Sequence, residues 1–206
     1  MASFKTADEK KEAMRKIRDE VFELRDSPLY TERVKNKVFP VIGEGSHDAH
    51  IFFIGEAPGR NEAATGRPFC GAAGKILDSL LAEAGLKREE VYITNIVKDR
   101  PPRNRDPFPD EIEAYAPFLD RQIEIIEPRI IATLGRYAMQ YILEKFNLWE
   151  ELQPIGKLHG RVFEADAPYG KLKIIPLYHP AAAIYNRATL DDLKKDFAVL
   201  KKISAL

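Results

Sequence analysis

The stretch Ile51-Phe52-Phe53-Ile54-Gly55-Glu56-Ala57-Pro58-Gly59 joins a short apolar run to a turn rich in glycine and proline. An apolar run that ends at turn residues is typical of a strand buried within a sheet. Three further apolar runs follow, at residues 91–97, 129–134 and 172–178, and each also ends at a turn. Helical segments separate most of these runs. Strands that alternate with helices in this way predict a parallel sheet.

Right-handed crossovers between parallel strands place helices on both faces of a sheet. The sequence therefore predicts an α/β fold of three layers, α/β/α, around a central, mainly parallel four-stranded sheet. No repeat or linker divides the chain, so we expect one domain across residues 1–206. The predicted helices cover residues 8–26, 74–84, 109–126, 137–146 and 190–203, Pro28 ends the first of them, and residues 37–42 form a short strand or edge ribbon.

The composition limits the classes of function. The 32 basic residues balance the 32 acidic ones, so any contact with nucleic acid must depend on local basic patches. No apolar stretch is long enough to span a bilayer and no signal peptide is evident, so we expect a cytoplasmic protein without membrane contact. The single cysteine, Cys70, excludes an internal disulfide and a multi-cysteine metal cluster.

Turn and polar residues follow each predicted strand at its carboxyl end. Glu56 follows the first strand, Asn95 lies near the end of the second, Gly135 follows the third and His179 follows the fourth. Ligands of open parallel sheets bind at this edge. The groups suit a flat, hydrogen-bonding heterocycle, so the sequence predicts a pocket for one nucleobase.

The glycine-rich stretches do not match phosphate-binding motifs. Residues 55–59 are not GxGxxG, and Pro58 interrupts the helix start that a dinucleotide needs. Residues 71–75, Gly-Ala-Ala-Gly-Lys, lack the Walker spacing and the Ser or Thr that holds magnesium. We therefore expect no nucleoside-triphosphate site, and plain turn glycines are the alternative interpretation.

Three separated motifs resemble one known family. They are GEAPGRNEAATGRPFCGAAGKILD at residues 55–78, VYITNIVKDRPPRNRDPFPDE at residues 91–111 and LYHPAAAIYN at residues 177–186. In this order they resemble the type-four uracil-DNA glycosylases, and the match runs from about Leu24 to the C-terminal helix. The resemblance implies a monofunctional enzyme of base excision repair that flips uracil out of DNA and hydrolyses its N-glycosidic bond. It also implies a monomer associated with the nucleoid.

The resemblance assigns roles to three residues of the predicted pocket. Phe69 would stack on the flipped uracil, a contact worth roughly 1–3 kcal/mol. Asn95 would pair with uracil N3–H and O4, because one amide offers an acceptor beside a donor, whereas cytosine presents the reverse pattern. His179 would donate a hydrogen bond to uracil O2 as negative charge develops on the leaving base, and a neutral imidazole suffices for this. The alternatives are a core phenylalanine, a strand-end asparagine that closes a turn, and a structural histidine.

The resemblance leaves the activation of water open between two carboxylates. Another branch of the superfamily has an aspartate where this chain has Ala57. Ala57 and Gly59 are predicted to bind the base together with Phe69 and Asn95. Glu56 and Glu62 are the available carboxylates, and either would orient water or stabilise the sugar cation. Glu62 is also a candidate for crowding uracil C5, which would exclude the methyl group of thymine. The predicted catalytic set is therefore His179, Glu56 and Glu62.

We expect the DNA contacts to come from two segments. One is the arginine loop, residues 100–105, together with the adjacent lysine, and the other follows His179. Arginines contact phosphates without reading the sequence, and residues 182–185 are candidates for an apolar wedge that fills the gap left by the flipped base. A merely solvated turn is the alternative for the loop. The predicted DNA-binding residues are Lys98, Arg100, Arg103, Arg105, Tyr185 and Arg187, and the substrate is uracil-containing DNA, single- or double-stranded.

The chain departs from the family at the iron–sulfur ligands. Type-four enzymes usually hold a [4Fe–4S] cluster through four cysteines, and the aligned motifs place Leu24, Ser27, Asp99 and Tyr115 at those positions. The sixteen-residue spacing from Asp99 to Tyr115 is kept. Leucine, serine and tyrosine are not credible cluster ligands, so we expect no cofactor. Apolar packing by Leu24 and Tyr115, and a pairing of Asp99 with Arg25 or Arg100, are the expected replacements.

Three alternatives remain beside uracil excision. One is a glycosylase of altered base preference, for hypoxanthine or a modified uracil. The second is a catalytically weak protein that binds damaged bases or abasic sites, against which the retained His179 argues. The third is a glycosidase of free nucleosides, against which the arginine loop argues.

Overall fold

The computed structural model describes residues 6–204 and contains a six-stranded sheet in the order β1-β3-β2-β4-β6-β5. The four inner strands are parallel to one another, and the two edge strands are antiparallel to their neighbours. The three layers and the mainly parallel sheet are confirmed. The strands are β1 (Glu44–Gly45), β2 (Ile51–Gly55), β3 (Tyr92–Asn95), β4 (Ile130–Leu134), β5 (Phe163–Ala167) and β6 (Gly170–Leu177).

The sheet has two strands more than the expected four, namely the edge strands β1 and β5. β1 has only two residues, and β5 alternates buried and exposed side chains, with two acidic residues on its exposed face. Neither has the continuous apolar run that marks the inner strands. Residues 37–42 do not enter the sheet: Lys37 ends the preceding helix, and the extended segment after it forms isolated backbone bonds, such as Phe39 N to Ala63 O.

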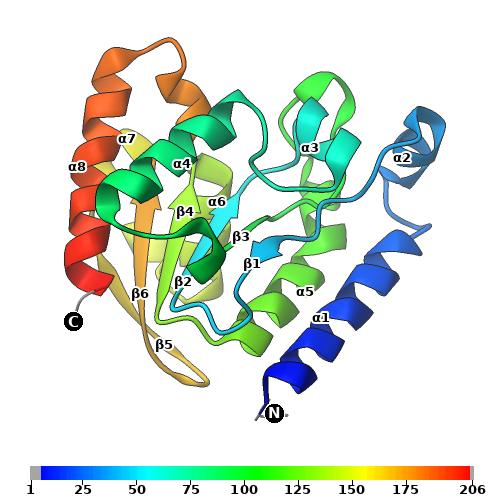
Figure 1. Cartoon of the computed structure of the whole chain (residues 1–206), viewed down its shortest axis with the longest axis horizontal. Coiled ribbons are helices and arrows are strands. Elements are labelled where there is room, and N and C mark those ends of the chain that lie inside the picture. Colours follow the sequence, from blue (N-terminus) through cyan, green and yellow to red (C-terminus); the bar gives the residue numbers. More distant parts are fainter. Residues whose placement is uncertain (1–5, 205–206) are drawn as a thin grey trace.

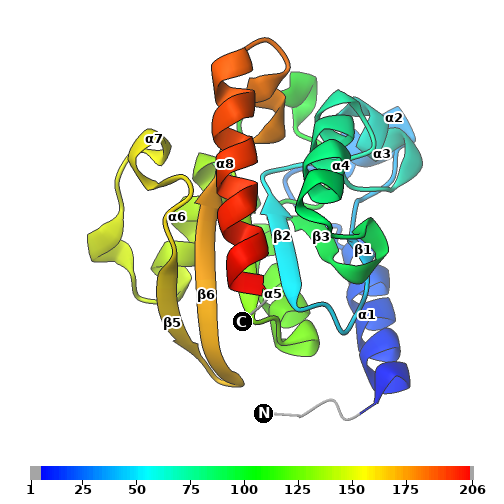
Figure 2. The same ribbon diagram turned by 60° about the vertical axis from the view of Figure 1, so that its left-hand side comes forward.

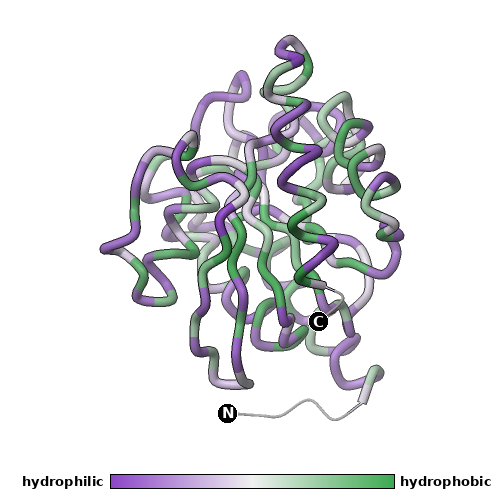
Figure 3. The backbone as a smooth tube through the Cα atoms, turned by 90° about the vertical axis from the view of Figure 1, so that its left-hand side faces the viewer, coloured by the Kyte–Doolittle hydropathy of each residue, from purple (hydrophilic) through white to green (hydrophobic). Residues whose placement is uncertain are grey.

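The five predicted helices are all present, with ends shifted by a few residues, except that the first ends at Phe22, well before Pro28. Its start is fixed by a capping box between Thr6 and Glu9. Figure 3 shows the resulting pattern, in which the central strands are largely hydrophobic and many outer loops hydrophilic. The α-helices are α1 (Ala7–Phe22), α2 (Tyr30–Asn36), α3 (Arg60–Thr65), α4 (Ala72–Ala84), α5 (Pro109–Ile126), α6 (Arg136–Lys145), α7 (Ile155–Leu158) and α8 (Arg187–Ser204); single 3₁₀ turns span Arg88–Glu90, Pro102–Asn104, Trp149–Glu151 and Pro180–Ala183.

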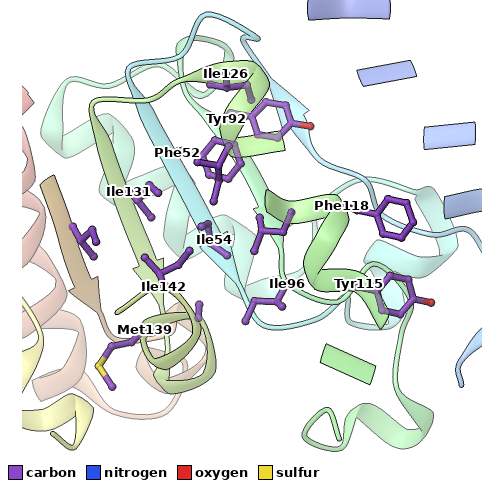
Figure 4. Packing of buried hydrophobic residues seen from close by; sticks show 14 of the residues in the cluster. Phe52, Ile54, Tyr92, Ile96, Tyr115, Phe118, Ile126, Ile131, Met139 and Ile142 are labelled. Atoms are coloured by element: carbon purple, nitrogen blue, oxygen red, sulfur yellow. The ribbon is translucent and has the colours of Figure 1, made fainter. Parts of the chain in front are cut away.

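Helices cover both faces of the sheet (Figure 1). α4 and α8 pack together over one face, and α8 runs back across β6 against the direction of the strand (Figure 2). α5 and α6 cover the other face, where α1 lies against α5. Figure 4 shows this second core, with Phe52 and Ile54 of β2 meeting side chains of α5 and α6. No helix within residues 6–204 is both long enough and apolar enough to cross a membrane.

The strand directions decide where a site forms. β2, β3, β4 and β6 are parallel, so the segments that follow them emerge at one edge of the sheet. The stretches after Gly55, Asn95, Leu134 and Leu177 therefore meet there, although they are far apart in the sequence.

Candidate active site

The carboxyl edge of the sheet contains a pocket of about 450 Å³. It draws its lining from the segments after β2, β3 and β6, from α3 and from the start of α4. The structure therefore brings together every residue that the sequence predicts for catalysis or base binding, although their individual roles stay predictions. These residues are Glu56, Ala57, Gly59, Glu62, Phe69, Asn95 and His179.

Asn95 and Phe69 meet beside Gly55, whose missing side chain makes room for both. Asn95 ends β3 and is paired with Gly55 in the parallel register. A Cβ atom on Gly55 would lie 2.3 Å from the Asn95 Oδ1 atom and 2.7 Å from the Phe69 Cζ atom. The amide and the aromatic ring thus adjoin at one wall of the pocket, and both side chains are almost wholly buried.

The loop that holds Phe69 is built around an unusual backbone conformation. Phe69 has a φ of +46°, in the left-handed region that non-glycine residues rarely adopt. Its carbonyl lies against the first turn of α4, where a Cβ atom on Gly74 would lie 1.8 Å from the Phe69 oxygen. Glu62 fastens this loop, since its Oε1 atom accepts hydrogen bonds from the backbone N–H of Cys70 (3.0 Å) and Gly71 (2.8 Å). The buried Glu62 carboxylate therefore anchors the aromatic wall.

The protonation of His179 is fixed by its surroundings. Its Nδ1 atom accepts a hydrogen bond from the backbone N–H of Ala181 at 3.1 Å. Burial lowers the pKa of His179 to about 4, although the Glu62 carboxylate acts to raise it. At neutral pH the imidazole is therefore uncharged, with its proton on Nε2. The ring lies 5.6 Å from that of Phe69, between centroids.

Glu56 is the pocket carboxylate whose pKa is shifted towards neutrality. Burial, followed by the nearby negative charge of Asp106, raises the pKa of Glu56 to about 7, while Arg136 acts to lower it. Asp106 is itself held by Arg136 and by the hydroxyl of Tyr137, which donates to it at 2.9 Å. A carboxyl group with a pKa near 7 suits proton transfer at neutral pH.

The arginine loop is partly committed to contacts within the protein. Both Nη atoms of Arg105 bind the Glu111 carboxylate, and its guanidinium lies 3.7 Å from the centroid of the Phe108 ring. Arg100 donates to the Asn104 side chain at 2.6 Å. Exposed DNA-binding candidates remain at both ends of the site, and Tyr185 is the most open of them at 95% exposed. The exposed candidates are Arg103, Tyr185 and Arg187.

The prediction that Lys98 contacts DNA is wrong for this structure. Its side chain is 0% exposed and lies in the interior, not on the surface. The lysine points inward because Gln122 of α5 and the end of β3 offer it buried oxygen acceptors. A lysine next to an arginine loop therefore need not share the exposure of that loop.

Three of the four positions that align with cluster ligands form a buried hydrogen-bonded network. The Tyr115 hydroxyl donates to Asp99 Oδ2 at 2.6 Å and lies 2.6 Å from the Ser27 hydroxyl. Arg33 completes the network by donating to Asp99 Oδ2 at 3.0 Å and to the carbonyls of Val21 and Phe22. In Figure 4 the ring of Tyr115 adjoins the core cluster and its hydroxyl points away from the strands.

The partner of Asp99 in this network differs from expectation. Asp99 pairs with Arg33, whereas Arg25 pairs with Glu23 and Arg100 binds Asn104. Leu24 is partly buried against the core, as expected. No local pattern indicates Arg33 as the partner, because it lies 66 residues from Asp99. Among residues 6–204, no group of three or more His, Cys, Asp or Glu side chains is placed to hold a metal ion.

Comparison with known proteins agrees with this geometry. A family model described as "Uracil DNA glycosylase superfamily" matches residues 42–201. The type-4 uracil-DNA glycosylase of Archaeoglobus fulgidus is 47% identical over 172 residues, which are 84% of each chain. That of Sulfurisphaera tokodaii is 44% identical over 94% of this chain and 86% of the relative. That of Thermotoga maritima is 40% identical over 84% of this chain and 94% of the relative.

Proposed function

The chain belongs to the uracil DNA glycosylase superfamily, and on this basis we propose that it excises uracil from DNA by hydrolysing the N-glycosidic bond, as a step of base excision repair. The observation that carries the proposal is the meeting of Asn95, Phe69 and His179 in one pocket large enough for a flipped base. The relatives are named as glycosylases of this type, and the chain retains an aromatic wall, an amide and an imidazole donor for the chemistry.

Recognition of the base rests on Asn95 and Phe69. The amide accepts from uracil N3–H and donates to uracil O4, while the Phe69 ring stacks on the face of the base. Cytosine offers the reverse pattern of donor and acceptor and leaves both amide groups unpaired. A site built to hydrogen-bond one edge rejects the mismatched base by factors of about 10⁴.

Departure of the base rests on His179. As the bond between C1′ and N1 breaks, its electron pair moves onto uracil, and negative charge grows on O2. The Nε2–H group of the neutral imidazole donates a hydrogen bond to that oxygen, and the Ala181 N–H keeps the ring in the required tautomer. No proton needs to leave His179, so the low pKa of the imidazole does not hinder the step.

Addition of water rests on Glu56. The bond to the base breaks first and leaves an oxocarbenium-like sugar, to which water adds at C1′ while its proton passes to the Glu56 carboxylate. The raised pKa of Glu56 suits it to hold that proton near pH 7. Glu62 serves differently, because its Oε1 atom is occupied by two backbone donors of the Phe69 loop. Glu62 therefore holds in place the loop that carries Phe69.

We assign the fold a stabilising network in place of the iron–sulfur cluster of type-four enzymes. Iron–sulfur clusters are held by cysteine thiolates, in some cases together with histidine, and the aligned side chains offer a hydroxyl, a carboxylate, a phenol and an aliphatic group. The oxygen atoms of Ser27, Asp99 and Tyr115 are already bonded to one another or to Arg33. The residues therefore do not fit the cluster, and no step of the reaction is routed through it.

Contact with DNA is proposed for groups beside the pocket, of which Arg103 and Arg187 are exposed and Arg100 is half-buried. Arg100, Arg103 and Arg187 bind phosphates, which fixes the position of the strand without reading its sequence. Ile184, which is 38% exposed, and Tyr185 fill the space vacated by the flipped nucleotide. These contacts favour DNA over a free nucleoside as the substrate.

Base release from oligonucleotides tests this function and its rivals. Wild type and His179→Ala are assayed on single- and double-stranded substrates that carry uracil, hypoxanthine or a thymine mismatch. We expect wild type to release uracil fastest and the variant to be slower by about 10²–10³-fold. Faster release of hypoxanthine would establish the altered base preference, and tight binding without release of any base would refute the enzymatic function.

A further inference from the structure

The buried side chain of Lys98 touches the residue that reads the base, yet the mechanism above does not use it. Its Nζ atom donates to the main-chain oxygen of Asn95 at 2.7 Å, to the hydroxyl of Thr94 at 2.8 Å and to Gln122 Oε1 at 2.6 Å. None of the ion pairs identified within residues 6–204 includes Lys98, and the adjacent Asp99 is engaged by Arg33. A buried amine with only uncharged partners is costly, so its retention calls for an explanation.

The acceptors around Lys98 are themselves held in place. Gln122 Nε2 donates to the Ile42 carbonyl at 2.9 Å and to the Tyr92 hydroxyl at 3.2 Å, which leaves its Oε1 atom directed at the amine. The Thr94 hydroxyl donates to the same Ile42 carbonyl at 2.6 Å. Three fixed oxygens match the three donors of an ammonium group. Burial lowers the pKa of Lys98 well below its ordinary value, and the neutral amine keeps two donors, which are enough for the Asn95 carbonyl and Gln122 Oε1.

The contact with Asn95 closes the end of strand β3. After Asn95 the backbone leaves the ladder through bonds from Ile96 N to Gly55 O and from Val97 N to Glu56 O. Lys98 then turns its side chain back to the Asn95 carbonyl, three residues earlier. The Asn95 peptide is therefore held on one side by β2 and on the other by the amine. The direction of its side-chain amide into the pocket depends on that peptide.

We infer that Lys98 is a positioning residue for base recognition, whose amine clamps the Asn95 carbonyl so that the Asn95 amide meets the uracil edge. This inference rests on the proposed function, because it requires that Asn95 read the base. It explains why an amine, and not an apolar side chain, fills a wholly buried position next to Asn95. An amide misplaced by about 1 Å costs about 100-fold in rate.

A double-mutant cycle between Lys98 and Asn95 separates positioning from general stability. Lys98→Met keeps the length of the side chain and removes the donors. Gln122→Met is the matched control, because it removes a partner of the same amine and leaves the Asn95 contact in place. Single-turnover rates of uracil release are measured at saturating enzyme, at a temperature where circular dichroism shows each variant folded.

We expect Lys98→Met to slow release by about 10–100-fold in the wild-type background and by less than about 3-fold in the Asn95→Ala background. Gln122→Met should slow it by less than about 3-fold. Should Lys98→Met not fold, Lys98→Gln enters the same cycle. The glutamine amide supplies polar groups to the buried site, but it is one atom shorter than the lysine side chain and does not reach the Asn95 carbonyl, so we expect the same result.

Equal slowing by Lys98→Met in both backgrounds, or no slowing in either, would overturn the inference and leave the proposed function intact. Equal slowing by Gln122→Met and Lys98→Met would also overturn it, because the network would then act as a whole. Absence of uracil release by wild type would refute the proposed function itself, so the two failures are distinguishable.

Discussion

Tyr115→Phe tests the network that stands at the positions of the cluster ligands. The substitution removes one oxygen atom and leaves the ring, which is wholly buried in the core, in place. Two hydrogen bonds are lost, both 2.6 Å long, one to the Ser27 hydroxyl and one to the Asp99 carboxylate. The partners are not wholly stranded, because Ser27 still accepts from the Leu29 N–H and Asp99 still accepts from Arg33.

The expected loss of stability follows from these two bonds. A neutral hydrogen bond contributes about 1 kcal/mol and one to a charged group about 1.5–3 kcal/mol. The free energy of unfolding of Tyr115→Phe should therefore fall by about 2–4 kcal/mol, which lowers the midpoint of thermal unfolding by roughly 4–16 °C for a chain of this size. Urea unfolding followed by circular dichroism measures the free energy, and calorimetry the midpoint.

Tyr141→Phe is the matched control for the same chemical change. The Tyr141 hydroxyl donates to Asp120 at 2.8 Å, but Asp120 also pairs with Lys145 and stays within reach of water. We expect a loss of less than about 1.5 kcal/mol for this variant. If Tyr115→Phe is no less stable than Tyr141→Phe, the network does not stabilise the fold as we propose. The rate of uracil release by folded Tyr115→Phe should stay near that of wild type.

Three further predictions concern the pocket and its rim. The single-turnover rate should rise as pH increases through the pKa of Glu56, which is about 7, because only the ionised carboxylate accepts a proton. Glu56→Gln should remove this rise, and an unchanged pH profile of the variant would exclude Glu56 as the base. Arg103→Ala should weaken DNA binding for all sequences alike and reduce the slope of log Kd against log salt by about 1, whereas an unaltered slope would place Arg103 away from the phosphates. Gly55→Ala should slow release by about 100-fold in a folded protein, because the new Cβ atom displaces Asn95 and Phe69, and a wild-type rate would show that these side chains adjust freely.

The sequence predicts well those features that depend on short-range patterns. The inner strands are continuous apolar runs, and parallel topology places their carboxyl ends at one edge, so the sequence alone predicts which residues line the pocket. The sequence does not predict strand β5, because its alternation of Phe163 and Ala165 with Glu164 and Asp166 spans only five residues and is too short to stand out. Such a segment becomes a strand only because β6 pairs with it.

The sequence does not predict features that depend on partners distant in the chain. The Lys98 side chain points inward because Gln122, on α5, accepts a hydrogen bond from its amine. The neighbouring residues of the arginine loop do not indicate this direction. Arg33 reaches Asp99 across 66 positions, so the nearer Arg25 and Arg100 were the natural but incorrect candidates. Side-chain direction at these sites is decided by tertiary packing, and a pattern along the chain carries no information about it.

Iron and acid-labile sulfide, measured in protein purified without air alongside uracil release by the same preparation, test most directly whether the protein works without a cluster. We expect full release of uracil by protein that contains no stoichiometric iron and shows no visible absorption from a cluster, at a rate that a chelator does not change. A brown protein with about four irons per chain, or one whose activity is lost with its iron, would contradict it.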